Sequence, residues 1–359
     1  MTLITPFVLS IVLAQTSAPP PPVQQSPQKV TQSEQTLDSL RIQVALDRAG
    51  FSPGAIDGNV GASTKKALEA YRQANGSDLQ PTEPTTGYAI TDADVAGPFE
   101  PRIPAELPDQ AKLKSLAYKD VVELLAERFH TTPALLKKLN PAAKFAVGEQ
   151  IAVPNVEPLQ IPNGGETQAI PAPKQKPAAD AKPAPGAKPA PGPKPAPGAK
   201  PQGQQPVGTG GNANTADAAA TTPDVVVSVS KALSALTVTD ATGKVVMYAP
   251  VTTGSEHDPL PIGEWKVNGI TINPPFRYNP DLFWDADPSH NKALLKPGPN
   301  NPVGLVWIDL SKEHYGIHGT SEPSTVGRTQ SHGCVRLTNW DAVKLANLVK
   351  PGTKVVFKP

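Results

Sequence analysis

A long proline-rich segment, residues 162–223, most constrains what this chain can fold into. Its centre repeats Pro, Ala and Lys without any large apolar side chain (KPAPGAKPAPGPKPAPGAKPQ). Such a segment cannot bury enough apolar surface to offset the entropy of ordering it, so it is expected to stay extended and disordered. We interpret it as a spacer that divides the chain in two. The alternatives are a ligand for a proline-recognising groove and a lysine-bearing arm that lies along an anionic surface.

The composition favours several small domains over one large core. The 359 residues include 44 prolines, and only 38% of the residues are hydrophobic and 5% aromatic. The formal net charge of +1 removes the usual electrostatic reason to expect nucleic acid as a partner. The single cysteine excludes an intrachain disulfide and a thiolate zinc cluster.

The first residues predict export. Residues 3–14 form an uncharged apolar run that is too short to span a bilayer, and small residues follow it at the spacing that signal peptidase prefers. We expect a signal peptide over 1–18, a disordered stretch over 19–35, and no transmembrane segment in the mature protein. No Lys or Arg precedes the run, so a disordered or core-buried start is the alternative. The expected location is the periplasm or cell wall.

Residues 36–78 predict a small helical domain. A glycine-punctuated turn around Asp57 and Gly58 separates two helical patterns, and Ser63 or Thr64 is the expected N-cap of the second. The expected buried face consists of Leu40, Val44, Leu46, Ala67, Leu68 and Tyr71. This pattern resembles the peptidoglycan-binding domain of the helical-bundle type. A generic helical pair that uses glycine in its turn is the alternative.

Residues 113–156 predict a second small domain of mixed α and β structure. Helices over 121–129 and 133–139 are followed by a closing strand over 150–154. This order looks like a LysM glycan-binding module, although its usual first strand is represented only by the short segment 116–118.

Residues 224–358 predict a mainly β domain, sandwich- or barrel-like, with one late helix over 340–348. Short segments of alternating hydrophobicity are separated by Gly, Pro and Asn clusters. Strands are expected over residues 225–230, 236–239, 244–251 and 353–358.

The side chains that carry chemistry lie between positions 314 and 336. Cys334 follows His332 by two residues and His318 by sixteen, and a neighbouring imidazole can stabilise or generate a thiolate. Gly333 permits a tight turn that exposes the sulfur and turns backbone N–H groups toward a developing oxyanion. Arg336 would point to the same side in an extended strand and could hold a substrate carboxylate.

These residues allow two other interpretations. A lone cysteine can be an inert buried side chain. A metal site could use His314, His318, His332 and Cys334, but glycines between and beside the first two histidines oppose the helix that this spacing requires. We therefore expect no metal and no cofactor.

The motifs carry a family resemblance. The sequences HGT at 318–320 and SHGCVRL at 331–337 look like the active-site signature of the L,D-transpeptidase (YkuD-type) catalytic domain. Upstream, TG at 253–254 and LPIGEW at 260–265 match a further segment of that family. The resemblance covers about 224–358.

The resemblance implies a role for each motif residue. Cys334 would be the nucleophile that attacks a peptidoglycan stem amide and forms a thioester. His318 would accept and later donate the proton, with its imidazole steadied by the carbonyl of Gly319. His332 and the backbone amides of Gly333 and Cys334 would shape the oxyanion pocket.

The substrate-binding set comes from the motif and from an insertion over 270–300. The insertion is either a packed surface loop or a substrate-facing cover. The expected substrate contacts are Arg336, Ser331, Thr320, Tyr278, Phe283 and Trp284.

The resemblance implies an enzyme of cell wall biogenesis and cell shape that acts on peptidoglycan, with the spacer as a tether that raises the local substrate concentration. An acceptor amine on a second stem would give a cross-link, water would make the enzyme a carboxypeptidase, and a protein amine would anchor a protein such as an outer-membrane protein to the wall. The other classes are a non-catalytic peptidoglycan-binding protein and a metal-dependent amidase.

Overall fold

The computed structural model describes residues 32–161 and 224–359. The predicted signal peptide over 1–18 and the predicted linker over 162–223 lie outside these residues. Within the two described ranges, no helix combines the length and the apolar character needed to cross a membrane. We call residues 32–161 the N-terminal unit and residues 224–359 the C-terminal unit.

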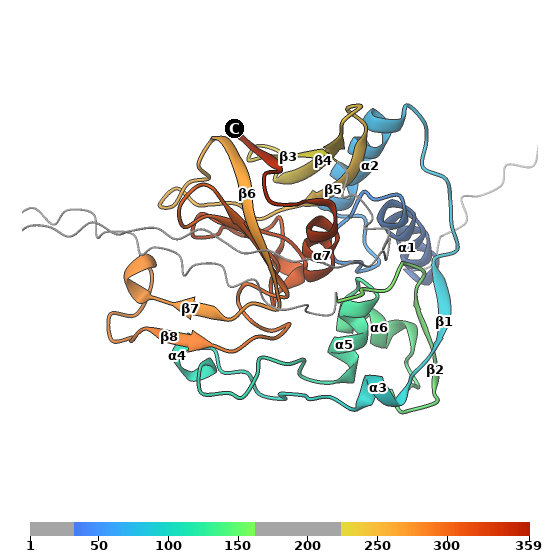
Figure 1. Cartoon of the computed structure of the whole chain (residues 1–359). Coiled ribbons are helices and arrows are strands. Elements are labelled where there is room, and N and C mark those ends of the chain that lie inside the picture. Colours follow the sequence, from blue (N-terminus) through green and yellow to red (C-terminus); the bar gives the residue numbers. More distant parts are fainter. Residues whose placement is uncertain (1–31, 162–223) are drawn as a thin grey trace, which may run out of the picture.

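The C-terminal unit is built on one mixed eight-stranded sheet with the strand order β11-β10-β9-β6-β12-β3-β4-β5. Figure 1 shows β3, β4 and β5 of this sheet side by side. Its strands are β3 (Val225–Ser230), β4 (Ala235–Asp240), β5 (Val245–Pro250), β6 (Gly263–Ile272), β9 (Val306–Leu310), β10 (Gly316–His318), β11 (Val335–Arg336) and β12 (Lys354–Lys358). Buried and partly buried side chains alternate along β3, as expected for a strand with one face on the core. β12 pairs in parallel with β3 and antiparallel with β6, so it lies in the middle of the sheet.

The two edges of this sheet meet. Thr252, just beyond β5, donates its N–H to the Arg336 carbonyl at 3.1 Å and accepts the Arg336 N–H at 2.9 Å. Because Arg336 belongs to β11 at the opposite edge, the sheet curls on itself, in agreement with the barrel-like form of the predicted fold. The predicted late helix is α7 (Asn339–Leu348), and its N-cap Thr338 accepts a hydrogen bond from the backbone of Asp341.

The helical pair predicted for 36–78 consists of α1 (Gln32–Arg48) and α2 (Ala62–Asn75). The predicted disordered stretch over 19–35 is wrong at its end, because α1 already includes residues 32–35. Four residues of the predicted apolar face are buried: Leu40, Val44, Leu46 and Ala67. Leu68 and Tyr71 are partly buried and pack against a neighbouring cluster.

The start of α2 differs from the prediction. Its N-cap is Gly61, and neither Ser63 nor Thr64 has that role. Thr64 is buried inside the helix instead, 3.4 Å from the side-chain amide of Gln43. The same amide donates to Asp57 at 2.9 Å, so Gln43 ties the glycine-rich turn to both helices.

The second half of the N-terminal unit has the order β1 (Thr85–Ala89), α3 (Asp92–Val95), α4 (Leu107–Gln110), α5 (Val121–Arg128), α6 (Pro133–Leu139) and β2 (Gln150–Pro154). The two predicted helices and the closing strand are confirmed. The strand expected at 116–118 is absent from this part of the structure, and β1 is the partner of β2. The predicted domain over 113–156 therefore begins too late. Leu116 bonds across to the C-terminal unit, where its N–H meets the Pro297 carbonyl at 3.1 Å.

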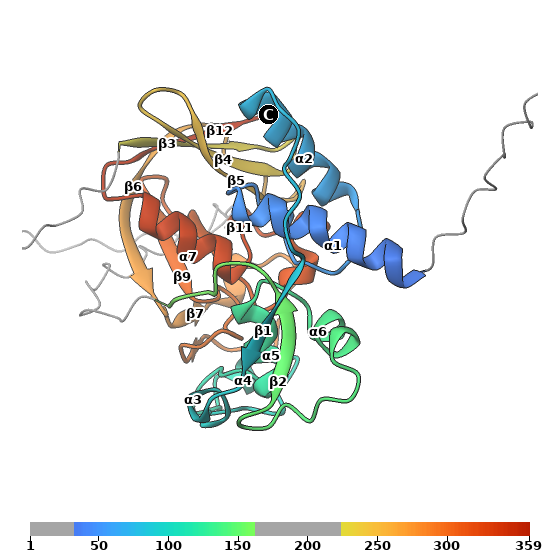
Figure 2. The ribbon, with the colours of Figure 1, turned by 90° about the vertical axis from the view of Figure 1, so that its right-hand side faces the viewer.

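Apolar contacts join the two units. Figure 2 shows α2 beside β5 of the sheet. The rings of Phe51 and Tyr248 stack with centroids 6.2 Å apart, beside α2 and β5. Leu116 is fully buried in a cluster with Tyr278 and Leu295 of the C-terminal unit. The halves of the chain are thus packed together, which corrects the view of a catalytic domain held only by a tether.

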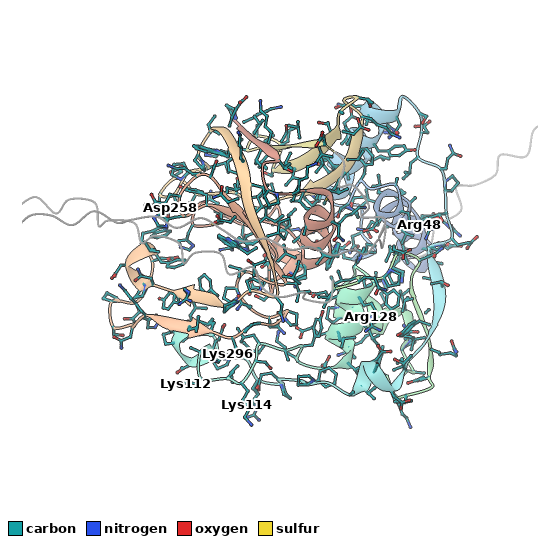
Figure 3. All side chains as sticks on the ribbon, viewed as in Figure 1. Arg48, Lys112, Lys114, Arg128, Asp258 and Lys296 are labelled. Carbon is teal, nitrogen blue, oxygen red and sulfur yellow. The ribbon has the colours of Figure 1, made fainter. Side chains whose placement is uncertain are left out.

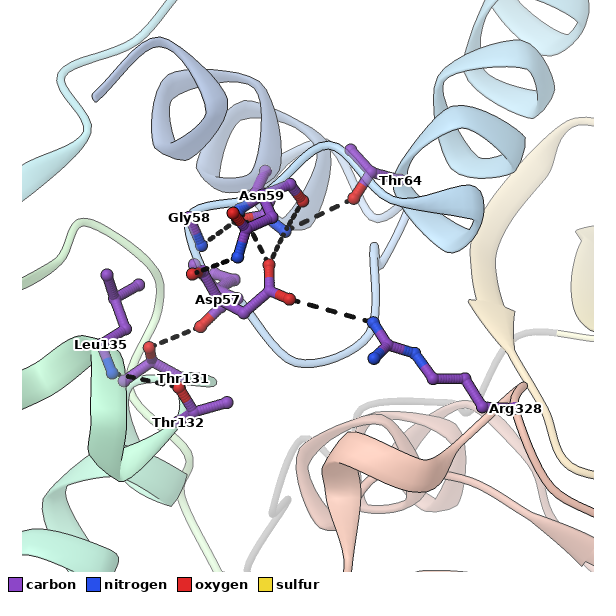
Figure 4. Close-up of polar contacts among 10 residues, drawn as sticks. Asp57, Gly58, Asn59, Thr64, Thr131, Thr132, Leu135 and Arg328 are labelled. Atoms are coloured by element: carbon purple, nitrogen blue, oxygen red, sulfur yellow. Dashed lines mark hydrogen bonds and ion pairs between the residues drawn. The ribbon is translucent and has the colours of Figure 1, made fainter. Parts of the chain in front are cut away.

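Polar contacts join the units as well. Ser52 donates its hydroxyl to Asp341 of α7 at 2.8 Å. The turn at Asp57 lies between α1, α2 and the C-terminal unit, where Arg328 approaches its carboxylate to 3.9 Å (Figure 4). In the same close-up, Thr131 belongs to the second half of the N-terminal unit and donates to the Ile56 carbonyl at 2.6 Å.

Candidate active site

His318 ends β10, between β9 and β11. Its Nδ1 lies 2.6 Å from the carbonyl oxygen of Gly319, as the family resemblance implied. A carbonyl accepts, so Nδ1 carries the proton and donates, which leaves Nε2 as the free base. The ring of Trp307 from β9 stacks on the imidazole with centroids 5.4 Å apart, and His318 is only 4% exposed.

Cys334 stands on the same face of the sheet as His318. β10 and β11 pair in parallel, with Ile317 opposite Val335 and His318 opposite Arg336. Side chains alternate along a strand, so Cys334 and Arg336, two residues apart, point to the side of His318. The Cys334 side chain is partly exposed, and Sγ lies 3.9 Å from the His314 carbonyl.

Hydrogen bonds and close packing hold the turn that carries the thiol in place. The Ser331 hydroxyl donates to the Cys334 carbonyl at 2.5 Å, and the Ser331 N–H donates to Thr253 at 3.0 Å. Gly333 has φ of +105°, and a Cβ there would lie 2.9 Å from the ring of Tyr315. Among the described residues, no hydrogen bond uses the backbone N–H of Gly333 or Cys334. Both donors are therefore free to bind a ligand oxygen.

Burial keeps both members of the pair uncharged. It raises the pKa of the Cys334 thiol, although the Arg336 charge acts in the opposite direction. It lowers the pKa of His318 to about 3, and the Arg336 charge lowers it further. Asp258, in the loop between β5 and β6 (Figure 3), also raises the pKa of the thiol. The resting state is a neutral thiol beside a neutral imidazole, which suits proton transfer during attack.

The insertion over 270–300 reaches the site. It contains the hairpin of β7 (Phe276–Tyr278) and β8 (Ala293–Leu295), joined through the short helix η1 (Pro280–Leu282). The next three residues surround His332. The Asp285 carboxylate lies 2.7 Å from His332 Nε2, and the rings of Phe283 and Trp284 lie 4.8 and 6.1 Å from the imidazole. Trp284 is 58% exposed beside the site, as the cover hypothesis requires.

The substrate contact of Tyr278 stays a prediction, although its side chain is buried. Tyr278 is 4% exposed and packs under the hairpin with Leu116 and Leu295, while its hydroxyl meets His290 Nδ1 at 3.0 Å. The substrate contacts predicted for Ser331 and Thr320 stay predictions. Both side chains are buried, and the Thr320 hydroxyl accepts the N–H of Glu322 at 3.2 Å.

Four residues at the site were missed by the sequence analysis: Trp307, Tyr315, Asp285 and Asn339. One sequence signal was available, because Gly316 has no side chain where the Trp307 ring needs room. A Cβ on Gly316 would lie 2.5 Å from that ring. Nothing local in the sequence indicates that Asp285 reaches His332, since 47 residues separate them.

The residues of the metal interpretation are not arranged as a ligand set. In the parts of the chain that the structure describes, no three His, Cys, Asp or Glu residues form a group that could hold a metal ion. His318 Nδ1 is engaged by Gly319, and His332 Nε2 is engaged by Asp285.

A partly exposed thiol, an oriented imidazole and two backbone donors without a hydrogen-bond partner lie at one curled sheet, and this combination suits acyl transfer through a thiol. Residues 224–357 match the sequence model of YkuD, the L,D-transpeptidase catalytic domain.

Individual proteins are similar to parts of this chain. A Bacillus licheniformis protein named as an L,D-transpeptidase, YkuD, is 48% identical over 64 residues, 18% of this chain and 39% of that protein. The Bacillus subtilis protein YqjB, named for the same activity, is 32% identical over 112 residues, 30% of this chain and 56% of its own length. The chain thus spans 39% of the first relative and 56% of the second. A solved L,D-transpeptidase from Mycobacterium smegmatis is 17% identical with a TM-score of 0.31, over 38% of this chain and 59% of that one.

Proposed function

We propose that this protein is an exported L,D-transpeptidase that transfers peptidoglycan stem peptides through a thioester on Cys334. The observation that carries the proposal is the site itself. His318 has its Nδ1 fixed by Gly319 at 2.6 Å and its Nε2 free, on the face of the sheet where Cys334 stands. The free N–H groups of Gly333 and Cys334 lie at the turn that carries the sulfur.

In the first half-reaction, Cys334 Sγ attacks the carbonyl carbon of a stem amide and its proton passes to His318 Nε2. The oxyanion accepts hydrogen bonds from the backbone N–H groups of Gly333 and Cys334, next to His332. The amide C–N bond then breaks, and His318 returns the proton to the leaving amine. Arg336, on the same face, supplies a cation for the carboxylate of the donor stem.

In the second half-reaction, an acceptor amine attacks the thioester carbon. The C–S bond breaks, His318 takes the proton of the attacking amine, and the sulfur is protonated again. The product is a cross-link between two stems. The same thioester would give a carboxypeptidase with water, or wall anchoring with a protein amine.

The N-terminal unit fits a role in holding the wall polymer. The helices α5 and α6 lie between the antiparallel strands β1 and β2, after the short helices α3 and α4, and this arrangement supports the LysM-like interpretation. The helices α1 and α2 with their Asp57 turn support the peptidoglycan-binding interpretation. We propose that both bind peptidoglycan and that the protein acts in the periplasm or cell wall.

The test is the intact mass of the purified protein after incubation with a carbapenem, compared with Cys334→Ala. The β-lactam amide is an electrophile that an acyl-accepting thiol opens, so the wild type should gain one adduct and the variant none. His318→Gln should slow formation of the adduct at least a hundredfold, because the base is lost. A wild-type protein without an adduct would contradict the proposal and favour a non-catalytic wall-binding protein. Stem-peptide dimers, free acid or protein conjugates, separated by chromatography, then identify the acceptor.

A further inference from the structure

We propose that Glu127, in the N-terminal unit, is a positioning residue for His318 and acts through the side chain of Asn339. Its kinetic consequence rests on the proposed function, whereas its structural consequence does not. The catalytic centre would then be completed by a residue from outside the C-terminal unit.

Asn339 holds the backbone next to His318. Its Oδ1 accepts the N–H of Thr320 at 3.2 Å and the N–H of Leu305 at 3.0 Å. Thr320 directly follows Gly319, whose carbonyl receives the Nδ1–H of His318. A Cβ on Gly319 would lie 2.1 Å from Asn339 Oδ1, so the amide fills the space beside this backbone. A shift of Asn339 would therefore move the carbonyl that orients the imidazole.

Glu127 decides which end of the Asn339 amide faces that backbone. Asn339 Nδ2 donates to both carboxyl oxygens of Glu127 at 3.0 Å, and only a longer contact of 3.3 Å joins it to the Pro299 carbonyl. A flipped amide would direct its NH₂ group at the N–H donors of Thr320 and Leu305, which is repulsive. The acceptor on α5 thus fixes the orientation that the catalytic strand needs.

Burying the carboxyl of Glu127 costs free energy of desolvation, and packing alone would not require a carboxyl at this position. The residue is 7% exposed, and burial raises the pKa of its carboxyl to about 8. Tyr118, on its own unit, donates its hydroxyl to Oε1 at 2.9 Å, and Asn339 supplies the remaining hydrogen bonds. An apolar side chain would pack α5 against α7 without the desolvation cost of a carboxyl. Unlike an apolar side chain, the carboxyl supplies a hydrogen-bond acceptor for Asn339.

The test compares three variants of the full chain: Glu127→Ala, Glu127→Gln and Ser52→Ala. The alanine at 127 removes the acceptor, while glutamine keeps an acceptor oxygen. Ser52→Ala is the matched control, because it deletes another hydrogen bond between the N-terminal unit and α7 without touching Asn339. The rate of carbapenem acylation and the melting temperature are measured for each. The imidazole Nδ1–H signal of His318 is followed by ¹⁵N-histidine NMR.

We expect Glu127→Ala to slow acylation by about tenfold or more, because a small misplacement of a catalytic group is costly. Its Nδ1–H signal should broaden or disappear. Glu127→Gln should recover both, and Ser52→Ala should lower the melting temperature and leave both unchanged. A wild-type rate and signal in Glu127→Ala, or equal losses in Ser52→Ala, would overturn the proposal. If the wild type itself is not acylated, the proposed function fails, and the NMR signal alone decides whether Glu127 positions His318.

Discussion

His318 shows how burial at a single residue sets the chemistry of the site. Burial and the neighbouring Arg336 both disfavour an imidazolium, so the imidazole stays neutral well below neutral pH. A Cys–His pair can also form an ion pair of thiolate and imidazolium. That arrangement would need a lowered pKa of the thiol and a raised pKa of the imidazole.

This arrangement predicts an unusual pH profile for acylation. With the pKa of His318 at about 3, its neutral fraction hardly changes between pH 7 and pH 5, so the carbapenem acylation rate should stay within about twofold. A histidine with an ordinary pKa would lose more than about tenfold in the same range. Initial rates by intact mass at several pH values measure this, and a tenfold fall toward pH 5 would contradict the neutral-pair description.

Gly333 gives a second prediction at the residue scale. With φ of +105° and the Tyr315 ring 2.9 Å from any added Cβ, Gly333→Ala should distort the turn and slow acylation at least tenfold. Gly352→Ala is the control, because it has φ of +93° and nothing within 4 Å of the added Cβ. Both changes should cost about 1 to 2 kcal/mol of stability from backbone strain, as measured by urea unfolding. Equal acylation rates in the two variants would show that the turn tolerates a side chain.

Only a few residues at the tip of the insertion reach the site. The hairpin packs on the N-terminal unit through Tyr278 and Leu295, while Asp285 and Trp284 reach His332. The hairpin strands of the insertion thus pack on the N-terminal unit, while the residues after η1 contact His332.

Loss of the Asp285 carboxylate should free the His332 ring. Asp285→Ala is expected to slow acylation several-fold and to leave the melting temperature within about 1 °C, because the carboxylate is about half exposed. Asp281→Ala removes another carboxylate of the same insertion, one that pairs with Lys292, and should leave acylation unchanged. If both variants react at the wild-type rate, the insertion has no part in orienting His332.

The elements also show what sequence could predict. The alternation of hydrophobic residues was sufficient to predict β3, and the late helix α7 was predicted to within one residue of its start. The HGT and SHGCVRL motifs led to His318 and Cys334, since their chemistry is local. The segment 116–118 was predicted as a strand, but its partners lie in the other unit, and contacts between distant segments leave no periodic signal. Asn339 was missed for the same reason, because Glu127 and Thr320 lie far from it in the sequence.

At the scale of the whole molecule, the interface between the units contains buried carboxyl groups. Burial raises the pKa of Glu127 to about 8 and that of Asp341 to about 6, while the carboxylate of Asp47 adds to the second shift. The folded state therefore keeps protons that the unfolded chain has already released at these pH values. The contribution of these groups to the free energy of unfolding is fully present below about pH 4. It is lost as the pH rises through their pKa values in the folded state.

Stability should thus fall between about pH 5 and pH 8, by at most about 1.4 kcal/mol per pH unit for each carboxyl. Urea unfolding at pH 5, 7 and 9 measures the slope. Glu127→Gln should flatten it above pH 6, where Asp341 is already ionised. Glu149→Gln is the control, because backbone N–H groups lower the pKa of this exposed carboxyl and confine its effect to acid pH. An unchanged slope in Glu127→Gln would contradict the raised pKa.

The position of β12 has a consequence for how the molecule is assembled. This strand is the last in chain order, yet it separates β6 from β3 in the middle of the sheet. A growing polypeptide that lacks β12 holds two half-sheets, β11-β10-β9-β6 and β3-β4-β5, with open edges facing each other. The catalytic strands β10 and β11 belong to one half and the β5 edge that closes on Arg336 to the other. The contact between Thr252 and Arg336 that closes the sheet therefore depends on pairing of β12 with both halves.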